Sequence, residues 1–268
     1  MSAVAAADVV RAAVGVWSVV VPTHVTAWGP HVEALDGPER RRVSESTVAP
    51  VAASRAAGYL LVRWVVGELL GVPPGDVALE RTCARCGEPH ARVRVTTDAG
   101  LHVSVSHTGP VGSPAPSGSR PGVVAVAVTR LAPVGIDLVR VGEADFPGFD
   151  AVALHPDEEP ARDSVARARL WARKEAAVKA VGTGLDLDPA SFAAPRPGAP
   201  APVGPGGATV AVADLADLAD LAGLAGLVGA VALARSDASV PVVVLGGAGS
   251  AWPWASAPAG PFRSPAQP

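Results

Sequence analysis

Three apolar segments in the middle of the chain have the length and composition of β-strands, and they lie between two helical patterns. The segments are "HVSVSH" (102–107), "GVVAVAVT" (122–129) and "APVGIDLVRV" (132–141). Residues 53–71 before them and 157–181 after them repeat apolar side chains at helical spacing. Helices and a sheet of this kind must bury their apolar faces against each other, so we predict the α+β class.

The order of helix, strands and helix occurs twice along the 268 residues. A strand at 14–21 precedes a helix expected to begin after Asp36, and a closing strand is predicted at 226–234. We therefore expect two similar α+β halves, an N-terminal half (1–130) and a C-terminal half (131–245).

Three segments carry weaker patterns. Residues 113–122 are rich in proline, serine and glycine and predict a flexible insertion. The "VADLADLADLAGLAGL" repeat (212–227) is compatible with a helix or with a loop lengthened by replication slippage. Residues 246–268 have the composition of a disordered tail.

The charge of the whole chain excludes some functions. A formal net charge of −3 gives no general basic field, so we expect no binding to nucleic acid. The N-terminal segment has charged residues inside its apolar run and does not resemble a signal peptide, and no apolar run is long enough to span a bilayer. We expect a cytoplasmic, monomeric protein without membrane contact.

The two cysteines, Cys83 and Cys86, form one "CARC" motif. With His90 they could supply three zinc ligands, but no second cysteine pair completes a tetrahedral site. A tight turn with reduced thiols is the other interpretation, and it is the one we favour.

Lysine occurs only twice, at Lys174 and Lys179, whereas the other basic residues are arginines. Trp171, Glu175 and Lys179 are spaced four residues apart and share one face of the predicted helix. Glu175 and Lys179 could form an ordinary surface ion pair, or they could present a carboxylate and an ammonium to a ligand.

Asp137 interrupts the apolar segment "VGIDLV" and needs a cation, since an unpaired buried carboxylate is costly. It could pair with an arginine or cap a helix, or together with Glu175 it could hold Mg²⁺. "SVSHTG" adds Ser106 and His107 at a strand end, where they could bind phosphate or simply pack.

In combination these motifs resemble the 4′-phosphopantetheinyl transferases of the larger, surfactin-synthetase-activating type. The matching segments are "SVSHTG", "VGIDLV" and "LWARKEAAVKAVGTGL", with weaker matches in "LDGPERRRV", "SRAAGYLLVRWVVGELLG" and "CGEPHARVRV". The resemblance implies a pseudo-dimer of two α+β halves with coenzyme A between them. It also implies transfer of 4′-phosphopantetheine from coenzyme A to a serine of an acyl or peptidyl carrier protein, which releases 3′,5′-ADP.

The same resemblance implies roles for single residues. Asp137 and Glu175 would bind Mg²⁺, Glu175 would take the proton of the carrier serine, and Lys179 would meet the pyrophosphate. The residues implied in coenzyme A binding are Arg55, Arg92, Ser106, His107, Lys174 and Lys179. An acidic carrier would need a basic surface, for which the cluster of Arg162, Arg167, Arg169 and Arg173 is favoured over the cluster of Arg40, Arg41 and Arg42.

The chain departs from the family pattern at two places. Val139 stands where many relatives have a second metal-binding acid, and Ala91-Arg92-Val93 replaces a Gly-Lys-Pro motif. An alternative is therefore a catalytically inactive relative that binds coenzyme A or a carrier protein, and a metal-dependent hydrolase of nucleotide diphosphates would share the carboxylates.

Overall fold

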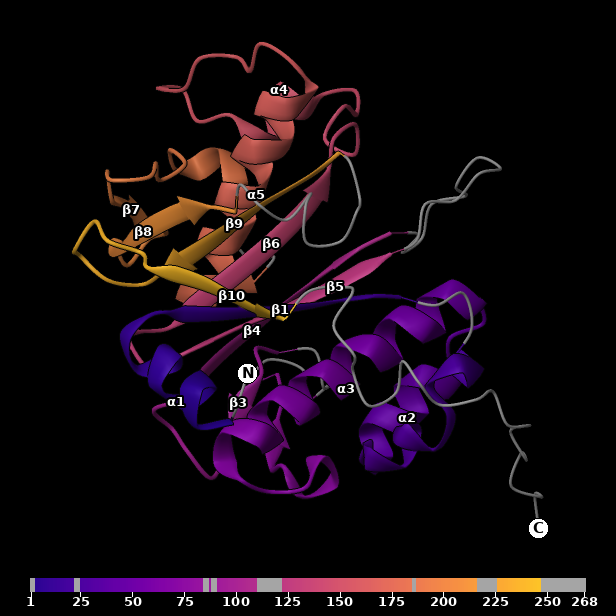
Figure 1. Ribbon diagram of the computed structural model, residues 1–268. Coiled ribbons are helices and arrows are strands. Elements are labelled where there is room, and N and C mark those ends of the chain that lie inside the picture. The colour runs from indigo at the N-terminus through magenta and orange to yellow at the C-terminus, as the bar shows by residue number, and fades with distance from the viewer. Residues whose placement is uncertain are drawn as a thin grey trace.

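The computed structural model describes residues 3–21, 25–83, 87, 91–109, 122–184, 187–215 and 226–246. Two β-sheets lie between two groups of helices, with α3 (Ala49–Leu70) on one side and α5 (Ser164–Val181) on the other (Figure 1). The mixed α+β class predicted from the sequence agrees with this architecture. Several segments lie outside the described residues: Cys86 and His90 of the alternative zinc site, most of the 113–122 insertion, most of the repeat, and the tail after Gly246.

The first sheet has six strands in the order β10-β1-β5-β4-β3-β2. These strands are β10 (Val242–Gly246), β1 (Val14–Val20), β5 (Val123–Thr129), β4 (His102–Thr108), β3 (Arg94–Val95) and β2 (Leu79–Glu80). All neighbours are antiparallel except β10 and β1, which run parallel. Strand β10 was not predicted from the sequence, and it lies at the edge of the first sheet beside β1.

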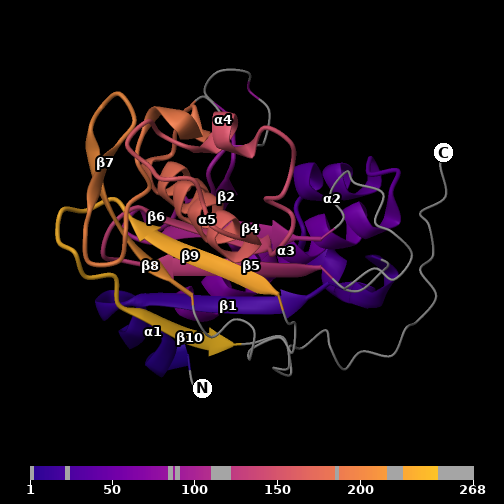
Figure 2. The same ribbon diagram turned by 90° about the horizontal axis from the view of Figure 1, so that it is seen from above.

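The second sheet has four antiparallel strands in the order β6-β9-β8-β7. They are β6 (Val134–Arg140), β9 (Leu227–Leu233), β8 (Ala208–Asp214) and β7 (Ala201–Val203). Its strand β9 lies over the first sheet when the molecule is seen from above (Figure 2).

The helices of the N-terminal part are α1 (Ala3–Ala12), α2 (Gly37–Ser44) and α3 (Ala49–Leu70), with the 3₁₀ segments η1 (Val25–Ala34) and η2 (Pro74–Asp76). Asp36 caps α2 by accepting a hydrogen bond from the Glu39 amide at 2.8 Å, as predicted. Helix α3 ends at Gly71, whose φ of 69° is a left-handed conformation that glycine adopts without strain.

The helices of the C-terminal part are α4 (Phe149–Ala153), α5 (Ser164–Val181) and η4 (Pro189–Ser191). The prediction that a helix begins at Asp157 is wrong. The helix begins after Asp163, whose carboxylate accepts a hydrogen bond from the Ala166 amide at 2.8 Å, and the segment before it forms a turn at Pro156 and Asp157.

Three groups of buried apolar side chains hold the layers together. One lies between α3 and the first sheet, one lies between the two sheets, and the third lies between the second sheet and α5. In β5 the even-numbered valines Val124, Val126 and Val128 belong to the first group, and Val123 with Ala125 and Ala127 belongs to the second. This alternation is expected of a strand buried on both faces.

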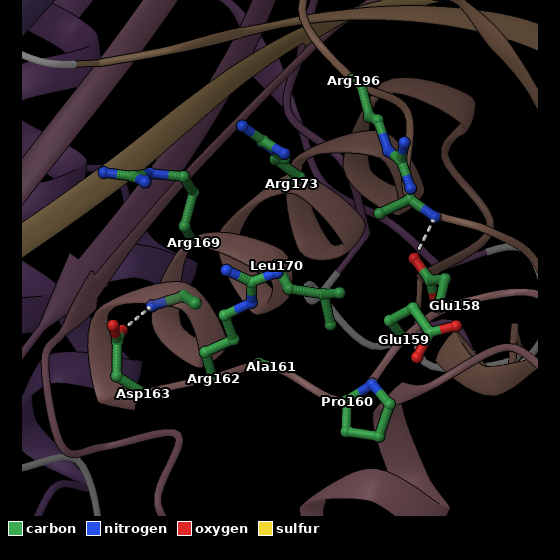
Figure 3. A pocket seen from close by; sticks show the side chains of 12 residues that line it. Glu158, Glu159, Pro160, Ala161, Arg162, Asp163, Arg169, Leu170, Arg173 and Arg196 are labelled. Atoms are coloured by element: carbon green, nitrogen blue, oxygen red, sulfur yellow. Dashed lines mark hydrogen bonds between the residues drawn. The ribbon is translucent and has the colours of Figure 1, made fainter.

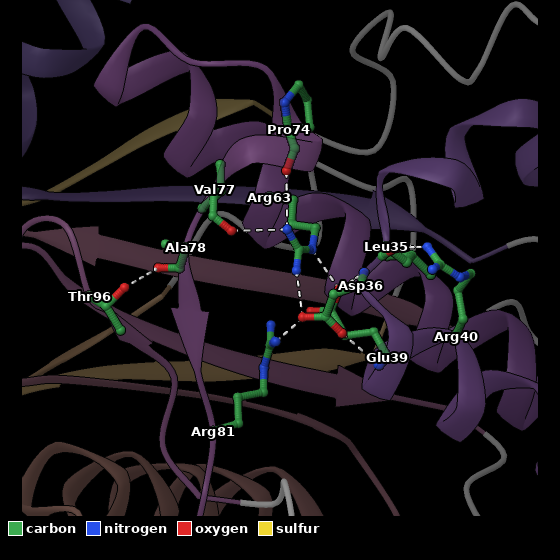
Figure 4. Close-up of polar contacts among 10 residues, drawn as sticks. All are labelled: Leu35, Asp36, Glu39, Arg40, Arg63, Pro74, Val77, Ala78, Arg81 and Thr96. Carbon is green, nitrogen blue, oxygen red and sulfur yellow. Dashed lines mark hydrogen bonds and ion pairs between the residues drawn. The ribbon is translucent and has the colours of Figure 1, made fainter.

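A buried ionic network closes the N-terminal part below the first sheet (Figure 4). The Arg63 guanidinium on α3 donates to Glu39 at 2.5 Å, to Asp36 at 2.7 Å and to the carbonyl oxygens of Pro74 and Val77. Because every charge in it has a partner, the network can be buried, and it ties α2 and η2 to α3.

No helix in the described ranges has the length and apolar composition needed to cross a membrane.

Candidate functional site

The candidate site lies where β4, β6 and α5 meet. Along β6, Val139 packs with α5, whereas Ile136 and Leu138 pack between the two sheets. Asp137 and Gly135 alternate with Ile136 and Leu138, so they share the α5 side of the strand with Val139. Strand β6 thus presents one carboxylate to the helix that carries Glu175 and Lys179.

Gly135 explains why the strand and the helix approach so closely. A Cβ atom added at this position would lie 1.9 Å from the Ala176 carbonyl oxygen and 2.6 Å from the Ala180 nitrogen. The backbone of α5 therefore occupies the space of any larger side chain. The two contacted residues directly follow Glu175 and Lys179 in sequence, so the contact sets how far both side chains lie from Asp137.

Asp137 is buried, with 8% of its surface exposed. Its Oδ1 atom accepts a hydrogen bond from the Ser106 hydroxyl at 2.9 Å and another from the Lys179 ammonium at 2.6 Å. Lys179 also donates to the Ile136 carbonyl oxygen at 3.0 Å. Within the described residues no hydrogen bond reaches Oδ2, so this oxygen remains able to bind a cation.

Glu175 lies close enough to Asp137 for their charges to interact. Its pKa is raised, first by burial, then by the negative charge of Asp137, while the positive charge of Lys179 acts in the opposite direction. No hydrogen bond to its carboxylate is recorded among the described residues. The side chain is half-buried, so it can still reach solvent or a ligand.

His107 lies between α3 and Lys179. Its pKa is lowered to about 4, first by desolvation and then by the positive charges of Lys179 and Arg55. The side chain is nevertheless exposed to solvent, a combination expected where protein atoms surround a group without covering it. At neutral pH the imidazole is uncharged and can donate one N–H.

Helix α3 leaves room for His107 only because it carries a glycine. A Cβ atom added at Gly58 would lie 2.5 Å from His107 Nε2. One turn earlier, Arg55 donates to Ser46 Oγ at 2.6 Å and to the Arg42 carbonyl oxygen at 3.1 Å through the same nitrogen. Arg55 and His107 therefore form the N-terminal side of the site, opposite α5.

Three residues predicted to bind coenzyme A have other contacts. Ser106 is 1% exposed and holds Asp137 and the Leu138 amide, so the structure places it inside the protein rather than against a phosphate. Arg92 donates to the carbonyl oxygens of Ala180 and Val134 at 3.2 and 3.3 Å, which fixes it at the C-terminal end of α5. Desolvation in this position lowers the pKa of Arg92.

Lys174 is the third of these residues, and it is fully buried at 0% exposure. Its ammonium pairs with Glu158 at 2.6 Å and donates to the carbonyl oxygens of Pro189 and Phe192. Lys174 thus points into the protein in this structure, and its expected contact with coenzyme A stays a prediction. Its ammonium holds the segments on either side of α5 together, because a buried ammonium needs several partners.

The carboxylates fit Mg²⁺ only with help from a substrate. The described residues contain no group of three or more His, Cys, Asp or Glu side chains placed to hold a metal. Val139 is packed in the apolar core beside α5 and leaves two carboxylates, Asp137 and Glu175. Mg²⁺ is commonly bound by one or two carboxylates together with waters and substrate phosphates, so this pair suits the ion when a pyrophosphate is present.

A separate pocket of about 380 Å³ lies beside the N-terminal half of α5 (Figure 3). Arginines line it together with acidic side chains: Arg162, Arg169, Arg173 and Arg196 with Glu158, Glu159 and Asp163. Arg173 donates twice to Asp214, at 2.7 and 2.6 Å. Side chains two positions apart on a helix point about 200° away from each other, so this pocket and Glu175 are on different sides of α5.

The predicted basic cluster is thereby divided. Arg167 does not line the pocket and instead lies over the Phe149 ring, with Asp145 and Asp150 at 3.9 and 3.8 Å. Arg167 precedes Trp171 and Glu175 by four and eight residues, which places all three on the same side of α5.

The sequence analysis missed several residues that position the site. Gly135 and Gly58 were visible as glycines inside a strand and a helix, a signal of close approach by another segment. The partner of Lys174 gave no signal, because Glu158 comes from an irregular segment sixteen residues earlier.

Comparison with known protein families gives a match over part of the chain. Residues 133–205 match the family model described as the 4′-phosphopantetheinyl transferase superfamily, and this segment includes Asp137, Glu175 and Lys179 but neither Ser106 nor His107. No curated protein sequence matches the chain. The segment from β6 to β7, with its two carboxylates and its lysine, is thus similar to the 4′-phosphopantetheinyl transferase superfamily.

Proposed function

We propose that this protein is an Mg²⁺-dependent transferase that moves 4′-phosphopantetheine from coenzyme A to a serine of an acyl or peptidyl carrier protein. The observation that carries the proposal is the convergence of Asp137, Glu175 and Lys179 from β6 and α5 inside the segment that matches the superfamily. The larger, surfactin-synthetase-activating type is proposed on the resemblance in "SVSHTG" and the other segments outside that match.

The reaction breaks the phosphoanhydride bond of coenzyme A and forms a phosphodiester with the carrier serine. The oxygen of the carrier serine attacks the phosphorus that bears pantetheine, the bond from that phosphorus to the bridging oxygen breaks, and 3′,5′-ADP leaves. Asp137 and Glu175 would hold Mg²⁺, and the ion would neutralise negative charge on the pyrophosphate oxygens. Without such neutralisation two carboxylates would repel the anionic donor.

Glu175 suits the removal of the serine proton. Burial and the charge of Asp137 raise its pKa, so its carboxylate binds a proton more readily than an exposed glutamate. Its lack of a recorded hydrogen bond within the described residues leaves its oxygens available to a hydroxyl. The proton acquired by Glu175 can pass to water once the product has left.

Lys179 suits the stabilisation of the leaving group. In the free protein its ammonium binds Asp137 and the Ile136 carbonyl oxygen, which holds it beside the carboxylate. A pyrophosphate bound against Asp137 would give this ammonium a second anionic partner as negative charge develops on 3′,5′-ADP. A neutral His107 and the remaining N–H groups of Arg55 would bind phosphate oxygens from the opposite side.

The test is to incubate the purified protein with an apo carrier protein, coenzyme A and MgCl₂ and to measure the mass of the carrier. A phosphopantetheine adduct on serine is the expected product, and Asp137→Ala and Glu175→Ala should each abolish it while the far-ultraviolet circular dichroism stays unchanged. Hydrolysed coenzyme A with an unmodified carrier would instead support a hydrolase. Binding of coenzyme A without either product would support an inactive relative.

A further inference from the structure

Two serines join the sheets of the protein at β6. Strand β6 is an edge strand of the second sheet, and its Ile136 and Leu138 amides do not face β9. The Ile136 amide donates to Ser104 Oγ at 3.1 Å, and the Leu138 amide donates to Ser106 Oγ at 3.0 Å. Side-chain hydroxyls of β4 thus take the place of a neighbouring strand.

The two serines are alike in every respect except one. Both are buried, at 7% and 1% exposure, both come from the same face of β4, and each accepts one hydrogen bond from a β6 amide. Within the described residues, Ser106 alone of the two also donates its proton, to Asp137 Oδ1 at 2.9 Å. The Ser106 hydroxyl is therefore fixed by two hydrogen bonds, one that it accepts from the Leu138 amide and one that it donates to Asp137. A fixed hydroxyl in turn fixes the position of Asp137 Oδ1.

This contact determines which oxygen of Asp137 can bind a cation. Oδ1 is occupied by the hydrogen bonds from Ser106 and Lys179, so Oδ2 is left as the free oxygen within the described part of the chain. A carboxylate that lost the Ser106 bond could rotate about its terminal torsion, because such torsions have broad minima. Lys179 alone would not prevent this rotation, since its flexible ammonium can follow either oxygen.

We propose that Ser106 is a positioning residue that orients the Asp137 carboxylate for metal binding, so that a strand outside the superfamily-matched segment controls the metal ligand inside it. This inference rests on the proposed function in that it takes Asp137 as a metal ligand. Ser104 has no such role and serves only the junction between the sheets.

The test compares Ser106→Ala with Ser104→Ala as the matched control and Ser106→Thr as the variant that keeps the hydroxyl. Each alanine variant loses one hydrogen bond to a β6 amide, whereas Ser106→Thr keeps it. A purely structural effect should therefore be similar in the two alanine variants. Two quantities are measured on the full chain: the orientation of Asp137 in metal-free crystal structures, and the affinity for Mn²⁺ in the presence of coenzyme A by electron paramagnetic resonance.

We expect Asp137 to change its side-chain torsion or to occupy two conformers in Ser106→Ala, and the Mn²⁺ affinity to fall about 10- to 100-fold, the usual cost of removing a residue that orients a metal ligand. Ser104→Ala should keep the parent's Asp137 orientation and Mn²⁺ affinity. Ser106→Thr should retain most of the parent's Mn²⁺ affinity. An unchanged Asp137 in Ser106→Ala, or equal losses of affinity in both alanine variants, would overturn the inference. A parent protein that binds Mn²⁺ but modifies no carrier would refute the proposed function and leave this comparison valid.

Discussion

Replacing Gly135 by alanine should separate the strand and the helix that build the site. The added Cβ atom would lie 1.9 Å from the Ala176 carbonyl oxygen, about 1.5 Å short of an ordinary contact. The obstructing atoms belong to the backbone of α5, so no side chain can rotate away and the whole helix must shift. Overpacking of a close-packed interior costs about 1–3 kcal/mol, and we expect Gly135→Ala at or above the upper end of this range.

The effect on activity should exceed what this loss of stability alone would cause. A shift of about 1 Å in reacting groups can reduce the rate roughly 10²-fold, and α5 carries both Glu175 and Lys179. The assays are urea unfolding followed by circular dichroism and carrier modification measured well below the unfolding midpoint. Under those conditions the protein is folded, so the lost rate reports the altered geometry.

Gly206→Ala is the matched control for this experiment. Gly206 lies in the turn between β7 and β8, and a Cβ atom there would meet nothing within 4 Å. Its free energy of unfolding should stay within about 0.5 kcal/mol of the parent, with full activity. Equal stability and equal activity of the two alanine variants would refute the argument that contact at Gly135 sets the site geometry.

Three further predictions concern Lys179, His107 and Glu175 of the site. In Lys179→Arg the planar guanidinium cannot replace a compact ammonium bound to Asp137, so kcat should fall, by less than the roughly 10²–10³-fold cost of deleting such a donor; unchanged kinetics would contradict this. Gly58→Ala should raise the KM for coenzyme A by displacing His107, while a gain in helix propensity of up to about 1 kcal/mol keeps the protein as stable as the parent in urea. Glu175 has a raised pKa in the folded protein, so its favourable contribution is present below the ordinary carboxyl pKa of 4.5 and is lost as the pH rises through the raised value. Metal-free Glu175→Gln should therefore gain stability relative to the parent with rising pH, and a constant difference in urea unfolding between acidic and neutral pH would argue against burial of this charge.

Regular patterns in the sequence predict much of the fold. The strands β1, β4, β5, β6 and β9 and the helix α3 lie close to their predicted ranges, because each carries enough apolar side chains to indicate its own period. Strands β7 and β8 were not predicted, since they lie in a stretch of proline, glycine and alanine whose apolar residues are too small and too scattered to show alternation. Strand β10 was not predicted either, and its pairing with β1 could not be, because sheet partners depend on contacts between distant segments.

Some features of the candidate site could likewise be predicted from the sequence, and others could not. Asp137, Glu175 and Lys179 could be predicted together, because a charged residue inside an apolar strand or on one helix face is visible in the sequence. The different contacts of Ser106 and Lys174 could not be predicted. Each depends on one hydrogen-bond partner that comes from another part of the chain, and residue type alone does not identify that partner.

The parallel pairing of β10 with β1 has a consequence for synthesis of the protein. Strand β1 pairs with β5 on one side, but its other side stays open until β10, more than 200 residues later, has been made. At about 5–20 residues per second, translation leaves this edge open for roughly 10–45 s after β1 itself has been synthesised. The nascent chain thus presents the unpaired backbone of Val14 and Val16 to the ribosome exit region and to chaperones for most of its synthesis.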